Sequence, residues 1–154
     1  MSLVETINPL VTGVVANSPL NYAAFSTLDV ATVQQGQPAM TVNYADSTVD
    51  HFDLKSFYYG CALGSEASVA GVPLPCTITV RGYSDYNGED LVATQNFDYK
   101  VGFLQLQTQM QKAVLGSGFK GVKKVEFDVS DELITAGLID TVFYTVYSTE
   151  RIGN

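Results

Sequence analysis

The single histidine, His51, is the side chain best suited to acid–base catalysis, and two carboxylates, Asp50 and Asp53, lie next to it in the sequence. A histidine can activate a serine or cysteine nucleophile when a third group orients it. The chain has no G-x-S-x-G nucleophile elbow, and Asp53 shares a face with His51 on an expected strand. The pattern therefore favours a histidine at the solvent side of a strand over a catalytic base.

Two other reactions can be weighed from the charged residues. The 16 acidic side chains make a pair of carboxylates at glycosidase spacing, roughly 5–10 Å, expected by chance alone. A lyase would need a base such as Lys or Tyr beside a neutralising arginine, and Arg81 and Tyr83 share one face of an expected strand. Neither set is a complete catalytic machine. A binding role is therefore favoured, and a small polysaccharide-active enzyme is the third hypothesis.

The chain has 154 residues, which predicts a single domain over residues 1–154. Its formal net charge of −8 would repel the phosphates of nucleic acids and anionic membranes, so we expect neither partner. No apolar run approaches the roughly 18 residues of a membrane span, and we expect no membrane insertion. Neutral polymers and cations remain as partners, and the sequence makes no prediction about the oligomeric state.

Cys61 and Cys76 are the only cysteines. A zinc site would need further Cys or His ligands nearby, and these are missing. The two thiols either stay free or form a disulfide, and their position on two strand-like segments that flank a turn-rich loop favours the disulfide. A disulfide implies an oxidising compartment. We therefore expect a secreted, extracellular domain. No signal peptide is recognised and polar residues follow Met1-Ser2, so we expect the mature form with a new start methionine.

The pattern of the chain is that of an all-β protein. Apolar and polar residues alternate in short segments, and turn signals such as Asn87-Gly88 separate them. Residues 103–115 have helix-forming Gln and Leu, but the alternation of Leu104, Leu106, Thr108 and Met110 with glutamines favours a strand. We predict a two-sheet antiparallel β-sandwich (a jelly roll) of about eight or nine strands, with one short helix near 131–136. The strands expected are 38–44, 51–63, 76–83, 91–101, 103–115, 121–129 and 137–147.

Tyrosines and amides indicate where a sugar could bind. Proteins bind sugars by stacking aromatic rings on them beside a few polar groups, and the absence of Trp weakens the case for crystalline polysaccharide. Tyr83 and Tyr86 flank a polar turn, so we expect both to be exposed. The predicted ligand-binding surface comprises these two with Thr77, Thr79, Arg81, Gln105, Gln107, Gln109 and Gln111. The alternative is that Thr and Gln simply coat a solvated sheet.

Four segments carry a family resemblance: "FDLKSFYYGCAL", "CTITVRGY", "GFKGVKKVEFDV" and "LIDTVFYTVY". In this order the chain resembles secreted fungal jelly-roll-like domains of uncharacterised function, and is similar to bacterial β-sandwich domains that precede PEP-CTERM sorting signals. The resemblance covers residues 50–147 and implies a lectin-like layout related to carbohydrate-binding modules. With the tyrosines and amides above, this layout leads us to expect a non-catalytic domain that binds glycan at a cell surface or on extracellular polymers. The alternative is a structural, adhesion or effector protein that works through protein contacts.

Asp140 stands on the apolar face of the final strand, with Leu138, Val142, Tyr144 and Val146. An unpaired charge there would be costly, so the carboxyl group must be hydrogen-bonded, paired with a base, or bound to a hard cation. The resemblance implies a structural calcium near the chain termini. In that layout the N-terminal segment neighbours the final strand, which makes Glu5 the candidate second ligand beside Asp140. All three arrangements stay open at this point.

Overall fold

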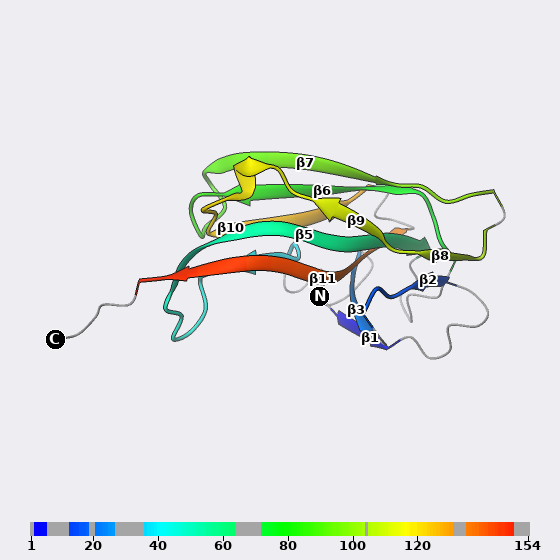
Figure 1. Ribbon diagram of the computed structural model, residues 1–154, viewed down its shortest axis with the longest axis horizontal. Coiled ribbons are helices and arrows are strands. Elements are labelled where there is room, and N and C mark those ends of the chain that lie inside the picture. Colours follow the sequence, from blue (N-terminus) through cyan, green and yellow to red (C-terminus); the bar gives the residue numbers. More distant parts are fainter. Residues whose placement is uncertain are drawn as a thin grey trace.

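A computed structural model describes residues 2–5, 13–18, 21–26, 36–63, 72–103, 105–130 and 135–149. In these ranges the chain is built almost entirely of strands (Figure 1). The strands are β1 (Ser2–Glu5), β2 (Gly13–Val15), β3 (Asn21–Phe25), β4 (Ala39–Thr41), β5 (Val49–Leu63), β6 (Cys76–Tyr83), β7 (Leu91–Tyr99), β8 (Gln107–Gln109), β9 (Gln111–Val114), β10 (Lys124–Val129) and β11 (Thr135–Ser148). A single 3-10 turn, η1 (Ser117–Phe119), precedes β10.

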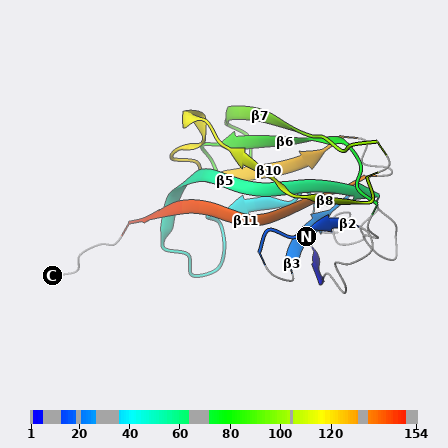
Figure 2. The same cartoon turned by 45° about the vertical axis from the view of Figure 1, so that its right-hand side comes forward.

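Two antiparallel sheets form the sandwich. One has five strands in the order β1-β3-β11-β5-β9, and the other has four in the order β4-β10-β6-β7. Figures 1 and 2 show β5 and β11 in one layer, with β6, β7 and β10 in the layer above them. A small parallel pair, β2 and β8, lies at one end. The prediction of an all-β sandwich is confirmed.

The core lies between the two sheets because the inward faces of their strands are apolar. On β6 and β10 the buried residues alternate with half-buried ones, as period-two patterning requires. The ring of Phe57 packs edge-on against Phe97 and Phe127, with ring centroids 5.6 and 5.4 Å away. The central aromatic contact therefore joins β5 of one sheet to β7 and β10 of the other.

The predicted disulfide is confirmed. Cys61 of β5 and Cys76 of β6 are bonded, with their Cα atoms 6.1 Å apart. Since β5 and β6 belong to different sheets, the bond ties the two layers together through the core. Both cysteines are buried. By the chain-entropy argument, closing a loop of this size stabilises the fold by about 3 kcal/mol.

The segment 103–115 differs from the single strand that its alternation predicts. It forms two short strands, β8 paired with β2 and β9 paired with β5. The alternation of Leu106, Thr108 and Met110 with exposed glutamines predicts that all three face the core. Thr108 and Met110 are buried, but Leu106 is 56% exposed, which corrects its predicted position. The alternation of buried and exposed residues breaks between β8 and β9, where the partner strand changes from β2 to β5. Met110 and Ala113, three positions apart, both belong to the core. Leu104 lies outside the described residues.

The helix predicted near 131–136 is not confirmed. Residues 131–134 lie outside the described ranges, and Thr135 and Ala136 already belong to β11. The described ranges form no helix long and apolar enough to cross a membrane.

The apolar face predicted for the final strand is also corrected. Leu138 and Asp140 are buried, but Tyr144 and Val146 are about half exposed. The register of β11 against β5 shifts between Asp140 and Phe143, where Thr141 takes a positive φ of 47°. Such a bulge changes the pairing of the strand locally. Beyond it β11 has no second neighbour among the described strands, since β3 pairs with it only as far as Ile139.

Candidate functional site

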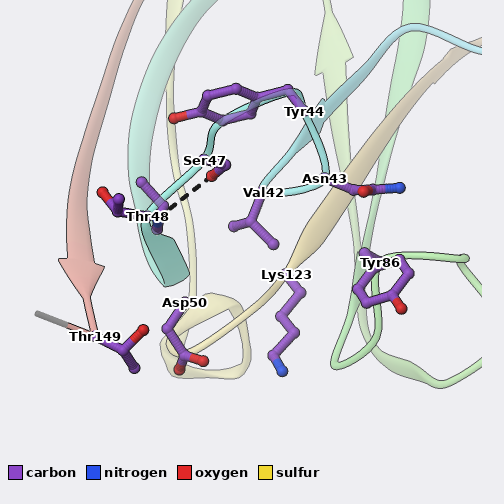
Figure 3. A pocket seen from close by; sticks show the side chains of 10 residues that line it. Val42, Asn43, Tyr44, Ser47, Thr48, Asp50, Tyr86, Lys123 and Thr149 are labelled. Carbon is purple, nitrogen blue, oxygen red and sulfur yellow. Dashed lines mark hydrogen bonds between the residues drawn. The ribbon is translucent and has the colours of Figure 1, made fainter. Parts of the chain in front are cut away.

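A pocket of about 280 Å³ opens where several loops meet at one end of the sandwich (Figure 3). Its lining comes from the turn between β4 and β5, the first residues of β5, the turn between β6 and β7, and the residues beside β10 and β11. The lining residues are Val42, Asn43, Tyr44, Ser47, Thr48, Val49, Asp50, Tyr86, Lys123 and Thr149. Figure 3 shows Tyr44 and Tyr86 on two sides of the pocket, with Val42 and Lys123 between them.

Tyr86 stands on a turn that its neighbour Asp85 organises. The Asp85 carboxylate accepts hydrogen bonds from three backbone N–H groups of the same turn: Asn87 at 2.9 Å, Glu89 at 3.0 Å and Asp90 at 2.8 Å. These hydrogen bonds, of which the one from the Asp90 N–H has the largest effect, hold the pKa of Asp85 below its usual value. These hydrogen bonds order the turn on which Tyr86 stands, and the Tyr86 side chain is half exposed (50%).

Tyr44, 58% exposed, is held in a similar way on the opposite side of the pocket. Its carbonyl accepts the Ser47 N–H at 3.1 Å, and the Ser47 hydroxyl accepts the Val49 N–H at 3.3 Å (Figure 3). The Val42 N–H donates to the Lys123 carbonyl at 3.0 Å, which joins this turn to the pocket floor. Two exposed tyrosines therefore face the pocket from separate, internally bonded turns.

A carboxylate and an ammonium group supply the charge. The ring Nδ1 of His51 donates to Asp50 Oδ2 at 2.8 Å. This hydrogen bond, with the nearby positive charge of Lys123, lowers the pKa of Asp50, so the group is ionised at neutral pH. No described residue forms an ion pair or hydrogen bond with the Lys123 ammonium group. The pocket thus presents one anionic acceptor and one cationic donor that a ligand can use.

The polar face predicted on β6 exists, but two of its side chains bond to carboxylates of the neighbouring strands β7 and β10. Thr77, Thr79 and Arg81 are half buried on the outward face. The Thr77 hydroxyl donates to Asp98 at 2.9 Å, and both terminal nitrogens of Arg81 donate to Asp128 at 3.2 Å. Such a face matches the alternative of a solvated sheet better than a ligand platform.

Tyr83 corrects the prediction of an exposed aromatic. It is only 8% exposed, and its hydroxyl donates to Glu126 at 3.0 Å. The Lys124 ammonium lies 6.0 Å from its ring centroid and bonds to the same Glu126 at 2.7 Å. Burial, followed by the bond to Glu126, raises the pKa of Tyr83. The residue is covered because its neighbours on β10 fold their long side chains over it.

The predicted glutamines lie elsewhere. Gln107 and Gln109 are on β8 of the small parallel sheet, while Gln105 accepts the Gly102 N–H at 3.0 Å in the preceding turn. They are exposed as expected, as Gln111 of β9 is in part, but β8 belongs to a different sheet from β6. Of the predicted ligand-binding set, only Tyr86 lines the pocket.

Sequence reasoning missed Tyr44 and Lys123, and it considered Asp50 only as a partner of His51, not as part of a binding site. One signal was available, since Tyr44 stands in the turn-like stretch "NYADS" between two strands. No local pattern connects Tyr44 with Lys123, because they are far apart in sequence and meet only through the pairing of β4 with β10.

Asp140 takes the first of the three arrangements that the sequence left open, a hydrogen-bonded carboxyl group. It accepts the Ser18 N–H at 2.7 Å, the Ser18 hydroxyl at 2.6 Å and the Thr141 hydroxyl at 3.0 Å. Burial alone would raise the pKa of Asp140, but these bonds outweigh it and lower the pKa.

The calcium site stays a prediction. Glu5 ends β1, whose register places it opposite Asn21 of β3, so β3 stands between β1 and β11. Neither Asp140 nor any other described residue belongs to a group of three or more His, Cys, Asp or Glu side chains that could hold a metal ion.

No protein-family model matches the chain, and none of the curated proteins compared with it is similar enough in sequence to count as a relative. The geometry of the site is therefore the ground on which a function can be proposed.

Proposed function

We propose that this protein is a secreted, non-catalytic domain that binds a neutral glycan in the pocket between Tyr44 and Tyr86. The observation that supports the proposal is the meeting of two exposed tyrosines, a carboxylate and an ammonium group around one pocket of about 280 Å³. That volume is just below the usual range for ligand pockets, roughly 300 Å³ and above, and suits a short stretch of sugar.

Each lining group has a part in recognising a sugar. A tyrosine ring stacks on the apolar C–H face of a pyranose, and two rings on separate turns can grip it from two sides. The Asp50 carboxylate accepts from sugar hydroxyls, and the Asn43 amide can both donate and accept. Lys123 donates to hydroxyl oxygens. Hydrogen bonds that involve an ionised partner are the stronger kind, so Asp50 and Lys123 should fix the orientation of the ring.

Charge favours a neutral ligand. The pocket holds one carboxylate and one ammonium group, while the chain as a whole carries a net charge of −8. A polyanionic glycan would be repelled on approach, whereas a neutral one is unaffected. The buried Cys61–Cys76 disulfide supports a site of action in an oxidising, extracellular compartment.

The test is a glycan array followed by calorimetric titration with the best neutral oligosaccharide. Removing one stacking ring, in Tyr44→Ala or Tyr86→Ala, should weaken binding about tenfold, which corresponds to ~1.4 kcal/mol. The matched control is Phe103→Ala, which removes an aromatic ring that is 96% exposed and does not line the pocket. Thr79→Ala tests the sheet face in the same way.

Unchanged affinity in both pocket variants, or a loss in Thr79→Ala alone, would move the site away from the pocket. An array without any glycan signal would overturn the carbohydrate proposal itself.

A further inference from the structure

The second half of β11 is a sheet edge. Its first part pairs with β3 on one side, at Gly137, Leu138 and Ile139, and with β5 on the other. From Phe143 to Ser148 the pairing with β5 continues, and no described residue pairs with the opposite edge. Figures 1 and 2 both show β3 beside the first part of β11 only. As far as the described ranges extend, the backbone groups on this side of the strand are therefore available to another strand.

This edge lacks the usual protection against pairing. Natural edge strands carry lysines, prolines or bulges, or are short. Residues 141–149, "TVFYTVYST", contain no charged residue, proline or glycine. The bulge of β11 lies at Thr141 and Val142, and at the two later register irregularities the residues without a partner, Lys55 and Asp50, belong to β5. Four large side chains on this stretch are between 43% and 60% exposed: Phe143, Tyr144, Val146 and Tyr147. A long, apolar and uncharged edge of this kind is suited to strand addition.

We propose that a second copy of this chain pairs with the edge, antiparallel and around a two-fold axis at Thr145. This register sets Phe143 opposite Tyr147 of the other copy, Tyr144 opposite Val146, and Thr145 opposite itself. Aromatic pairs, aromatic with β-branched pairs and threonine pairs are the cross-strand combinations that stabilise antiparallel sheets. The segment is thus complementary to its own reverse, as the symmetric interface of a two-fold dimer requires.

The register also keeps the two faces of the sheet consistent. The Phe143 ring lies under the ammonium group of the exposed Lys55, at 5.3 Å, and Thr145 and Tyr147 lie opposite the half-buried Asp53 and His51. Tyr144 and Val146 lie opposite the buried Leu54 and Phe52. Pairing around Thr145 joins outward residues to outward residues. A shift by one residue would join the outward face of one copy to the core-side face of the other.

The charge of the protein does not prevent a second copy from pairing with this edge, because the segments that meet are uncharged. Two copies that each carry a net charge of −8 repel each other at a distance, yet the paired segments bring no charge into contact. Salt screens the long-range term, since the Debye length falls to about 8 Å at physiological ionic strength. Dimer formation should therefore strengthen with salt. The dimer goes beyond the glycan proposal, and it would carry two pockets, which raises the avidity for a polymer.

Sedimentation velocity over a concentration series, at low and high salt, measures the equilibrium. We expect a dimer that is favoured by salt. Thr145→Lys and Thr145→Glu each place like charges face to face at the two-fold axis, so each variant alone should be monomeric. An equimolar mixture of the two should recover the dimer, which also shows that both variants are folded. The matched controls are Ser117→Lys and Ser117→Glu, at an exposed position on η1 away from the edge.

Cross-linking tests the register. In a non-reducing gel Thr145→Cys should form a covalent dimer, because residues directly opposite each other in antiparallel strands have Cα atoms about 4.5–5.5 Å apart. Ser148→Cys should not, since its counterpart would lie opposite Val142. A monomer at every concentration, a dimer unaffected by charge at position 145, or growth into fibres would each overturn the proposal.

Discussion

The Asp140 carboxylate and the Ser18 hydroxyl lie 2.6 Å apart, although 122 positions separate the residues in the sequence. The Ser18 N–H donates to the second oxygen of the same carboxylate at 2.7 Å. One side chain therefore holds the segment after β2 against β11, at the point where the bulge begins.

Replacing Asp140 by alanine should destabilise the protein by about 2–3 kcal/mol. The change leaves the Ser18 N–H without its acceptor, and hydrogen bonds to charged groups are worth about 1.5–3 kcal/mol. Urea unfolding measures the loss. Asp140→Asn, which keeps the shape and one acceptor oxygen, should cost less, and an alanine variant as stable as the parent would show that this contact does not support the fold.

The same carboxylate should make stability depend on acid. Because its hydrogen bonds lower the pKa of Asp140 in the folded state, the unfolded chain binds the proton more tightly. The stabilisation is fully present above the unfolded pKa of about 3.9 and is lost as the pH falls through the lower, folded value. Denaturation midpoints measured from neutral pH down to below the unfolded pKa should fall less steeply for Asp140→Asn than for the parent. Parallel curves would assign the acid sensitivity to other groups.

Chelation distinguishes hydrogen bonds at Asp140 from calcium. Because Ser18 and Thr141 already supply donors to both carboxylate oxygens, we expect the melting temperature to be the same with and without chelator. A ligand that binds only the folded state raises the melting temperature by mass action. A fall of several degrees in chelator, absent from Asp140→Ala, would instead support the calcium site with Glu5.

Removing the disulfide should cost about 3 kcal/mol. The double variant Cys61→Ala with Cys76→Ala avoids a buried free thiol, and its midpoint can be compared with that of the parent under reducing and oxidising conditions. Reduction should lower the stability of the parent and leave the variant unchanged. If reduction had no effect on the parent, the bond between β5 and β6 would not contribute to stability.

Particular elements of this fold could be read from local pattern. The bounds of β6, Cys76–Tyr83, agree with the predicted segment. In the predicted strand 121–129, Val125, Phe127 and Val129 alternate with polar residues and face the core in β10, as this alternation indicates. Period-two alternation is a property of neighbouring residues, so it survives in any sandwich. The disulfide could also be predicted from the sequence, because two cysteines on neighbouring strand-like segments allow only one pairing.

The site depended on contacts that no local pattern contains. Tyr83 and Tyr86 look alike in the sequence. Glu126 and Lys124 of β10, which is distant in sequence, cover Tyr83, whereas the turn that Asp85 organises holds Tyr86 at the pocket. Asp50 and Lys123 meet Tyr44 only after β4, β5 and β10 are assembled.

Asp140 shows the division most clearly. The sequence by itself determined that a carboxylate follows Leu138 and Ile139 in an apolar strand, and that it needed a partner because an unpaired buried charge is costly. The tertiary structure alone decided that the partner is Ser18, and that a bulge then exposes Tyr144 and Val146. Strand periodicity depends on neighbours in the chain, whereas burial and hydrogen-bond partners depend on which distant segments pack together.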